Sequence, residues 1–523
     1  MGFGNFAEVP NNTASSWYRD PGLRKGFLQI VILYTAVYSL GYDGSLLNGL
    51  QALPAWAEDF NRPAGTRLGL IAATYYLPKI PATFVIAWIV DRFGRKIPLY
   101  IGSLFMIAGA FLGGFAHNVG TLMGSRVLLG VGTAFAQITA CALVPELAHP
   151  RMRHHAGGFL NTTYYVGSIF AAWLTFAMVY YPGGSSWSWR IPTLVQGFGP
   201  VLLLGAIVVP ESPRWLVKNG REHEAHETLA KYHANGKMDD PLVLLEMREI
   251  KASVEIEKIS QSSSWLAFFQ TPGNRRRFFV IILLGTATQW SGNGVVQYFL
   301  VPVLKTVGIT RPPQTAGING GLSIFNWFVA MTGAGLVERV GRRKLFLTSI
   351  GGMLGCFCLI TALAGAYNGT KVKSTGVAMV PFIFFFMGFY SLAFTPLPML
   401  YTPEISPLTL RAKSAALLLL SQNCAQALNQ FANPIALKAI GWKYYFVYIG
   451  VLCVYFVLFY KTIRETRGLT TEEAAVVYES DEVREAAMAE ERRLHEEAAF
   501  LPEDTGLELK KSIQEDEVKK EGV

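Results

Sequence analysis

The chain has 523 residues, of which 51% are hydrophobic and 16% are charged. This is the composition of a protein surrounded by lipid, so the length rule that gives a soluble chain of this size about three or four domains does not apply. The net charge of +9 does not indicate a nucleic-acid partner, because most lysines and arginines lie in short gaps between apolar runs, as the positive-inside rule requires.

The five cysteines argue against a disulfide or metal framework. Their number is odd and all of them lie in apolar segments. We interpret them as small buried hydrophobic residues. Since the sequence also shows no metal-ligand spacing and no paired catalytic groups, it predicts no metal, no cofactor and no enzyme.

The first half of the chain predicts one bundle of membrane-spanning helices. Residues 1–26 are polar and lack the apolar core of a signal peptide, so we expect a cytosolic N-terminal segment. A six-helix bundle is then predicted over 27–210, because its apolar segments are long enough to cross a hydrocarbon core of ~30 Å. These segments cover 27–48, 68–90, 97–117, 121–143, 156–181 and 191–210.

The second half repeats this pattern after a charged segment. Residues 211–276 predict a cytosolic helical linker, and Ser212 followed by Pro213 indicates a helix start within it. A second six-helix bundle is predicted over 277–463, and the remaining 464–523 form a charged cytosolic tail. The spans of this bundle are expected at 277–304, 315–337, 344–366, 377–401, 411–436 and 442–461.

Two short motifs occur twice, in the same order. The loop that begins at Asp91 recurs at Glu338, 247 residues later, with the acid, the glycine and the next arginine at the same offset. The Pro-Glu motif at Glu146 returns at Glu404, 258 residues later. The chain therefore consists of two homologous halves, and duplicated membrane halves that meet around a central site are a transporter architecture.

These motifs carry a resemblance to a known family. Together with Pro210–Arg214 after the sixth span and Glu465–Thr470 after the twelfth, they resemble the sugar porter family of the major facilitator superfamily over roughly residues 30–475. Gln289–Gly294 and Phe394–Pro398 are similar to its fungal lactose permease and cellodextrin transporter branch.

The resemblance implies a fold and a function. The fold is an all-α major facilitator fold, with 12 transmembrane helices in two six-helix bundles. The function is import of a sugar across the plasma membrane by alternating access, by a protein that acts as a monomer with both termini in the cytosol. The partners are a small sugar, H+ and the lipid bilayer, and the substrate is a disaccharide of the lactose or cellobiose type. A facilitative hexose uniporter and a transporter-like sugar sensor stay open as alternatives.

Asp43 is an acid inside an apolar span, where a charge costs ~2.5–3.5 kcal/mol or more unless it is paired or faces water. The resemblance implies that Asp43 carries the proton and faces Arg126 in the fourth span. The alternative is a fixed structural ion pair without a role in coupling.

Polar amides within the spans are the candidates for sugar contact, because amides both donate and accept hydrogen bonds, as sugar hydroxyls do. By their place in the family motifs these are Asn161, Gln289, Asn293, Asn326 and Gln426. Hydrogen bonding between helices is the competing interpretation.

Three departures from the family motifs, Thr288, Gly294 and Met399, indicate a roomier site that favours a disaccharide. Trp290, Tyr298 and Tyr390 could refill that space.

The loop motifs predict charge-assisted contacts that control the conformation. The resemblance implies that they hold the outward-facing state together; a role as topology signals alone is the alternative. The expected pairs are Asp91 with Arg95, Glu146 with Arg153, Glu338 with Arg342, and Glu404 with Arg411.

Overall fold

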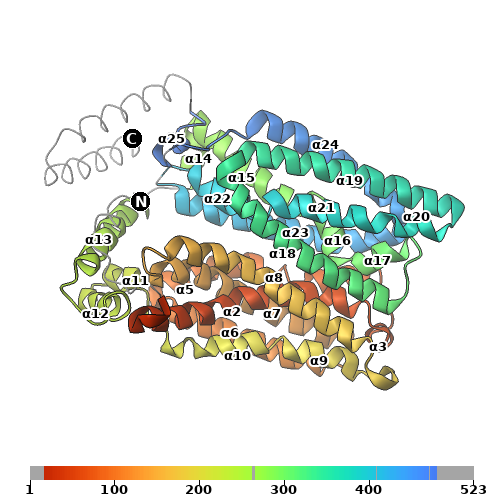
Figure 1. Cartoon of the computed structure of the whole chain (residues 1–523), viewed down its shortest axis with the longest axis horizontal. Helices are drawn as coiled ribbons and strands as arrows, with labels where there is room; N and C mark the ends of the chain where they lie inside the picture. Colours follow the sequence, from red (N-terminus) through yellow and green to blue (C-terminus); the bar gives the residue numbers. More distant parts are fainter. Residues whose placement is uncertain (1–16, 262–264, 408, 470, 480–523) are drawn as a thin grey trace.

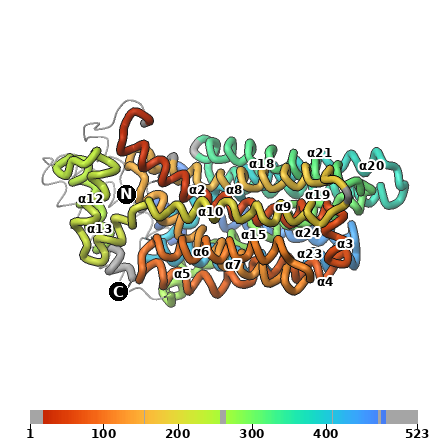
Figure 2. The backbone as a smooth tube through the Cα atoms, turned by 90° about the horizontal axis from the view of Figure 1, so that it is seen from below, coloured from red at the N-terminus to blue at the C-terminus, as the bar shows by residue number. Residues whose placement is uncertain are grey.

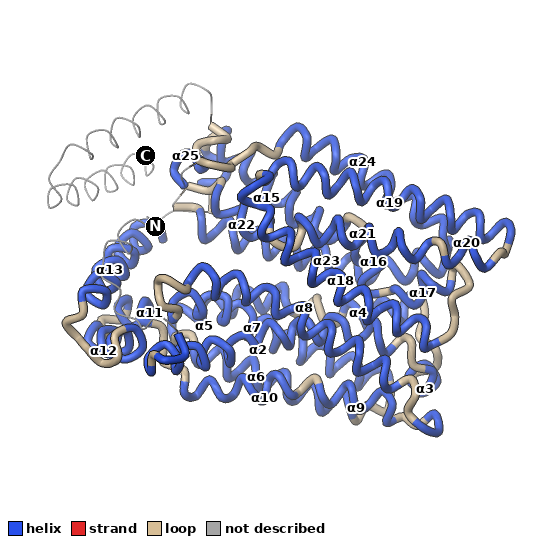
Figure 3. The backbone as a smooth tube through the Cα atoms, viewed as in Figure 1, coloured by secondary structure: helices blue, strands red, loops and turns tan. Residues whose placement is uncertain are grey.

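The computed structural model describes residues 17–261, 265–407, 409–469 and 471–479. The predicted N-terminal segment up to residue 16 and the predicted tail from residue 480 lie outside these ranges. Throughout the described residues the chain forms helices joined by loops, with no strand (Figure 3). The all-α prediction is therefore confirmed for this part of the chain.

The first half begins with a capped helix. The Asp20 carboxylate accepts hydrogen bonds from the backbone N–H groups of Gly22 (3.0 Å) and Leu23 (3.2 Å), and Pro21 occupies the first helical position. The elements of this half are η1 (Trp17–Arg19), α2 (Pro21–Leu50), α3 (Pro54–Asp59), α4 (Thr66–Ala73), α5 (Lys79–Phe93), α6 (Lys96–Gly114), α7 (Val119–Leu147), α8 (Arg153–Met178), η2 (Pro182–Gly184), α9 (Trp187–Val195), α10 (Phe198–Leu204) and η3 (Gly205–Val208).

The charged segment between the halves is helical. Ser212 caps its first helix by accepting a hydrogen bond from the Trp215 N–H at 3.2 Å, and Pro213 follows, so the predicted helix start is confirmed. Its elements are α11 (Pro213–Lys218), α12 (Glu222–His233), α13 (Pro241–Gln261) and α14 (Ala267–Gln270).

The second half begins at another capped proline helix, where the Thr271 hydroxyl accepts from the Asn274 N–H at 3.1 Å. Its elements are α15 (Pro272–Trp290), α16 (Asn293–Tyr298), α17 (Leu300–Lys305), α18 (Pro312–Val340), α19 (Arg342–Thr370), α20 (Lys373–Val377), α21 (Met379–Ala393), α22 (Leu397–Glu404), α23 (Arg411–Ile440), η4 (Gly441–Tyr444), α24 (Tyr445–Thr462) and α25 (Thr471–Ala475).

Together, these elements form twelve helical passes along the long axis of the molecule. Within the described residues, nine helical stretches are long and apolar enough to cross a membrane, and one of them, Arg411–Thr462, contains both α23 and α24. The broken pass α4–α5 and the more polar α8 complete the twelve. Four passes that the sequence predicts as continuous are interrupted, at 74–78, 196–197, 291–292 and 394–396. Pro78, Gly197, Gly292 and Pro396 lie at these breaks, where they weaken helix continuity.

The two halves form two bodies, the first half below and the second above in Figure 1. In the first half α2 packs on α8 and α6 on α7; in the second, α19 packs on α21 and α15 on α23. Contacts of α8 with α18 and of α4 with α23 join the halves. Helices α11–α13 lie at one end of the molecule, here called the linker end, and α3 and α20 lie at the other, the far end (Figures 1 and 2).

Among the residues at these breaks, we expect Gly292 to be the least tolerant of substitution by a residue with a side chain. Its φ is +94°, and an added Cβ would lie 2.6 Å from the Phe357 ring and 3.4 Å from the Tyr448 ring. We expect Gly292→Ala to destabilise the protein by about 1–3 kcal/mol, the cost of a left-handed non-glycine residue. Thermal unfolding in detergent measures this. Gly355→Ala is the control, because nothing lies within 4 Å of the added Cβ, and equal melting temperatures of the two variants would contradict the account.

Candidate functional site

A cavity of about 250 Å³ lies between the two halves. Helices α2, α5, α7 and α8 contribute to it from the first half, and α15, α16, α21 and α23 from the second. Its walls are amides and tyrosines more than aliphatic groups. The amides are Gln137, Gln289, Asn293, Gln297, Gln422, Asn423 and Gln426, and the tyrosines are Tyr75, Tyr76, Tyr164, Tyr165, Tyr298 and Tyr390.

The interrupted passes place side chains on this cavity. The turn at 74–78 between α4 and α5 carries Tyr75 and Tyr76, and it brings Lys79 to the first position of α5. The break at Ser291–Gly292 starts α16, where Asn293 and Gln297 lie one helical turn apart and both line the cavity. A continuous helix would not give these residues the same positions.

Hydrogen bonds between the halves close the far side of the cavity. Asn48 donates to the Asn319 amide oxygen at 2.8 Å, and Gln51 donates to the Tyr298 carbonyl at 3.0 Å. At the level of the cavity, Gln297 donates to the Tyr164 hydroxyl at 2.9 Å. The rings of Tyr76 and Tyr298 meet edge to face, with centroids 6.0 Å apart. Because Asn48 and Gln51 lie at the far-end terminus of α2, these contacts separate the cavity from the far end.

Three buried charged side chains lie together beside the cavity. Asp43 on α2 is 4% exposed, and its electrostatic interactions are with Lys79 and Arg126. Neither carboxylate oxygen of Asp43 has a hydrogen-bond partner among the described residues. Both cations lie near the Tyr75 ring, with Lys79 Nζ 4.0 Å and Arg126 Cζ 5.3 Å from its centroid. The predicted neighbours Asp43 and Arg126 are thus brought together, but without an ion pair within 4.0 Å.

Three of the five predicted sugar-binding amides line the cavity, namely Gln289, Asn293 and Gln426. The other two do not: Asn161 on α8 is exposed, and Asn326 on α18 is buried elsewhere. The predicted set of site residues did not include Gln137, Gln297, Gln422, Asn423 and Lys79. Their signal was present in the sequence, because each is a polar residue in an apolar span and two of them lie four residues from a predicted amide.

Two of the three departures thought to enlarge the site do not do so. A Cβ on Gly294 would overlap the Asn429 amide, so the space left by the missing side chain is already filled. Met399 on α22 is 40% exposed and does not line the cavity. Tyr298 and Tyr390 do line it, as the alternative allowed.

The loop motifs pair differently from the prediction. Arg95 donates from Nε and Nη2 to both oxygens of Glu146, each at 3.2 Å, and Arg342 Nη2 donates to Glu404 at 2.9 Å. Each bond therefore joins the first motif of a half to its second motif, in the same way in both halves. The expected partners of Asp91, Glu146 and Glu404 are wrong, because a sequence repeat shows which residues correspond but not how the loops fold onto each other. The expected pair of Glu338 with Arg342 stays a prediction.

The remaining loop residues have other surroundings. Asp91 lies 3.5 Å from Lys218 of the linker, and Arg153 lies 3.4 Å from Glu246. Arg411 is half-buried at the start of α23. The side chain of Glu338 lies outside the described residues.

A third acid in each half completes a repeated arrangement. Glu211 accepts hydrogen bonds from the backbone N–H groups of Arg95 (2.9 Å) and Lys96 (3.2 Å). Glu465 accepts in the same way from Arg342 (2.8 Å) and Arg343 (3.2 Å). Each carboxylate lies at the N-terminus of a helix, where a negative charge is stabilised. The repeated glycines Gly94 and Gly341, with φ of +88° and +97°, leave room for these carboxylates.

The sequence of this chain matches a known protein family. The family model "Sugar (and other) transporter" matches residues 28–478. The chain belongs to this family. The sugar porter is therefore a multi-pass membrane transporter rather than an enzyme, and its twelve passes are the two six-helix bundles of the major facilitator fold.

Its relatives are distant in sequence. It is 28% identical to the MFS-type transporter oryC of Aspergillus oryzae, with 88% of this chain and 87% of the relative covered. It is 24% identical to the hexose transporter HXT13 of Saccharomyces cerevisiae, with 87% and 84% covered. Among solved structures, the inward-open xylose transporter XylE of E. coli matches with a TM-score of 0.71, 20% identity and coverage of 87% and 100%.

In the sugar porter the linker docks on the first bundle through a buried histidine. His233 Nδ1 lies 2.6 Å from Glu246, its Nε2 lies 3.2 Å from the Leu147 carbonyl, and its ring meets that of His149 at 5.2 Å. Burial acts to lower the pKa of His233, but the charge and hydrogen bond of Glu246 outweigh it, so the pKa is raised. Burial and the neighbouring His233 lower the pKa of His149 to about 3.

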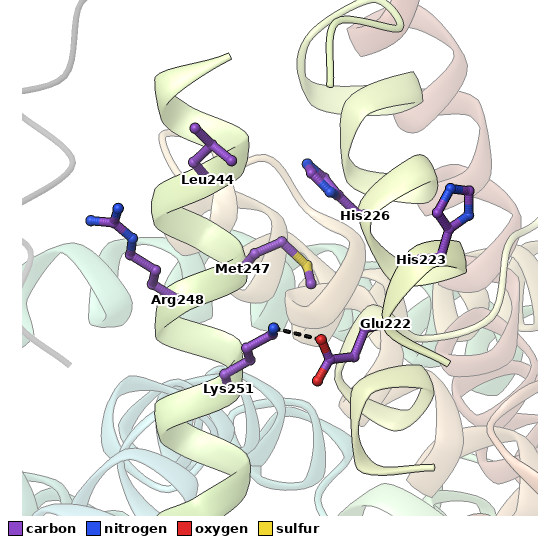
Figure 4. Close-up of a pocket in the computed structure, with 7 residues that line it drawn as sticks. All are labelled: Glu222, His223, His226, Leu244, Met247, Arg248 and Lys251. Atoms are coloured by element: carbon purple, nitrogen blue, oxygen red, sulfur yellow. Dashed lines mark ion pairs between the residues drawn. The ribbon is translucent and has the colours of Figure 1, made fainter. Parts of the chain in front are cut away.

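A second pocket lies on the linker itself, between α12 and α13 (Figure 4). Its residues include His223 and His226 on one helix and Met247 and Lys251 on the other, and Lys251 pairs with Glu222 at 2.5 Å. The side chains of His223, Lys251 and Glu222 are about half exposed or more. This pocket is remote from the cavity between the halves.

The docking of the linker is expected to depend on pH. Since the folded-state pKa of His233 is raised, its ion pair with Glu246 contributes fully below its ordinary pKa of about 6.5 and is lost as the pH rises through the raised value. We expect His233→Gln to lower stability by about 1.5–3 kcal/mol at pH 6, with a smaller difference at pH 9. Thermal unfolding across this range measures the effect. The exposed His223→Gln on the same helix is the control, and a pH-independent difference would contradict the ion pair.

Proposed function

We propose that this sugar transporter imports its substrate together with H+ by alternating access, with Asp43 as the proton site. The observation that carries the proposal is a buried carboxylate without hydrogen-bond partners among the described residues, next to two cations and the central cavity. A carboxylate in such surroundings can take up a proton without first breaking a hydrogen bond. One structural neighbour, XylE, is a proton:xylose symporter, and although it is similar in fold alone, its coupling agrees with this assignment.

The amides and tyrosines of the cavity are suited to a sugar. Gln289, Asn293 and Gln426 present groups that donate and accept hydrogen bonds, and the Asn293 amide oxygen has no partner among the described residues. Tyrosine rings offer flat apolar faces for the sugar ring. Because these residues come from both halves, a bound sugar would contact two bodies that move relative to each other.

We further propose that the linker end lies in the cytosol, at the plasma membrane, and that the monomer is the working unit. The concentration of basic residues in the loops of that end supports the orientation. The cavity is sealed toward the far end by Asn48 and Gln51, so this conformation would exchange substrate with the cytosol.

The substrate proposal keeps the disaccharide class, lactose or cellobiose, on the strength of the fungal motifs. A facilitative hexose carrier is the second candidate, because relatives such as the hexose transporter HXT13 bear that name. In that case Asp43 would be structural only.

The deciding experiment is uptake of labelled lactose, cellobiose and glucose into proteoliposomes, with and without an inward proton gradient. Accumulation of a disaccharide above equilibrium with the gradient supports symport. Equilibration without accumulation indicates a uniporter. A folded preparation that takes up none of them favours the sensor or a different substrate.

A truncation separates the sensor from the carrier. The cut belongs after Glu479, because Glu479 pairs with Arg277 at 2.6 Å and the Tyr478 hydroxyl lies 2.9 Å from that of Tyr401. A carrier that lacks 480–523 should keep its uptake, whereas a cut at 476 would remove these packed residues and confuse the two roles.

Asp43→Asn tests the proton site directly. The amide cannot ionise, so we expect gradient-driven accumulation to fall at least tenfold while exchange of sugar between the two sides of the membrane continues. Counterflow of labelled sugar without a gradient measures the exchange. The exposed linker variant Asp239→Asn should behave as the wild type. Full accumulation by Asp43→Asn would exclude the proton role.

A further inference from the structure

Resting on the proposed function, we propose that the preferred substrate of this cavity is an acidic sugar, whose carboxylate binds Lys79. The known relatives and the sequence motifs do not indicate an anion. The inference comes from the charges that the fold brings together at the cavity.

Lys79 is the charged side chain among the described residues that line the cavity. All other lining residues are amides, tyrosines, threonines, small residues and aliphatic residues. An amide-lined cavity is sufficient for neutral hydroxyl groups. A lysine there requires a separate explanation, because a charge within a membrane-spanning bundle is costly and rare.

The charges around the cavity do not balance. Asp43 supplies one negative charge, whereas Lys79 and Arg126 supply two positive charges, and all three side chains are at most 8% exposed. When all three are ionised, one positive charge is in excess near the middle of the protein. A buried charge needs a compensating partner or contact with water, and a monoanionic substrate supplies the missing negative charge.

The position of Lys79 leaves its ammonium group available to a ligand. Nζ lies over the rings of Tyr75 at 4.0 Å and Tyr76 at 5.2 Å, which is cation–π geometry. The described residues offer this nitrogen no ion pair within 4.0 Å. An ammonium group carries three hydrogens for donation, so a carboxylate in the cavity could accept from it while the rings hold it in place.

The geometry also orients the substrate. Lys79 belongs to the first half, whereas Gln289, Asn293 and Gln426 belong to the second. A sugar acid would place its carboxylate against the first half and its hydroxyls against the second. The simpler alternative is that Lys79 acts only as a counter-ion of Asp43. In that case the cavity would not distinguish an acidic sugar from a neutral one.

The experiment compares each neutral sugar with an acid in which one of its carbons is oxidised to a carboxylate. Lactose with lactobionate, cellobiose with cellobionate, and glucose with glucuronate, which keeps the pyranose ring, are tested for binding to the purified full-length protein at pH 7 by calorimetry, and for uptake into proteoliposomes. We expect at least one acid to bind at least tenfold more tightly than its neutral twin. Glucose 6-phosphate is included to distinguish a carboxylate from a phosphate.

Two variants test the residue. Lys79→Met should weaken binding of the acid at least tenfold and change that of the neutral twin less than threefold, whereas Lys79→Arg should retain the preference. Lys373→Met, at an exposed lysine of the far end, is the matched control and should leave both affinities unchanged. If Lys79→Met does not fold, the wild-type pairs and Lys79→Arg still decide the question.

The outcomes separate the two proposals. Uptake of neutral sugars without preference for any acid leaves the proposed function intact and overturns this inference. If Lys79→Met weakens binding of the acid and of the neutral sugar equally, Lys79 acts only as the counter-ion of Asp43. This result also overturns the acidic-sugar inference. Tighter binding of glucose 6-phosphate than of glucuronate would show a preference for a phosphate and overturn the assignment of a carboxylate. No binding or uptake of any sugar by folded protein refutes the proposed function itself.

Discussion

The burial of three charged side chains governs the structure at the centre of this molecule. Asp43, Lys79 and Arg126 come from three different helices, and each is at most 8% exposed. Side chains of this kind are stable inside a bilayer only where they face one another or a polar cavity. The broken second pass meets this requirement, because the turn at 74–78 brings the Tyr75 ring close to both cations and places Lys79 on the cavity. The polar walls of the cavity and the interrupted helices therefore both serve to stabilise the buried charges.

The repeated loops at the linker end have a different physical role from the one that their charges first indicate. Glu211 and Glu465 bind backbone N–H groups of their own half, and Arg95 and Arg342 bind acids of their own half. These bonds fasten helices within a bundle rather than one bundle to the other. Rocking requires that each bundle move as a unit, and two equivalent networks of charge-assisted hydrogen bonds provide that stiffness.

The sequence predicted the duplication, the helical passes and part of the cavity, because these depend on composition and on polar residues in apolar runs. Gln289, Asn293 and Gln426 were found by their place in motifs. Asn161 was not distinguishable from them, since only the rotation of α8 decides that it is exposed. The Arg95–Glu146 pair and the filling of the space at Gly294 by Asn429 depend on loops and side chains that lie far apart in the chain. Periodicity and spacing carry no information about such contacts.

The acidic-sugar proposal and the proton-site proposal support each other through electrostatics. When Lys79 and Arg126 are both charged, the three side chains carry a net charge of +1 with Asp43 ionised and +2 with Asp43 protonated. A carboxylate would therefore bind more tightly to the protonated carrier, and by linkage its binding would favour protonation to the same extent. A neutral sugar has no such direct electrostatic link and would need a conformational one. Under the two proposals, an excess positive charge beside a titratable acid would couple an anion to a proton within a single cavity, without a separate relay between two sites.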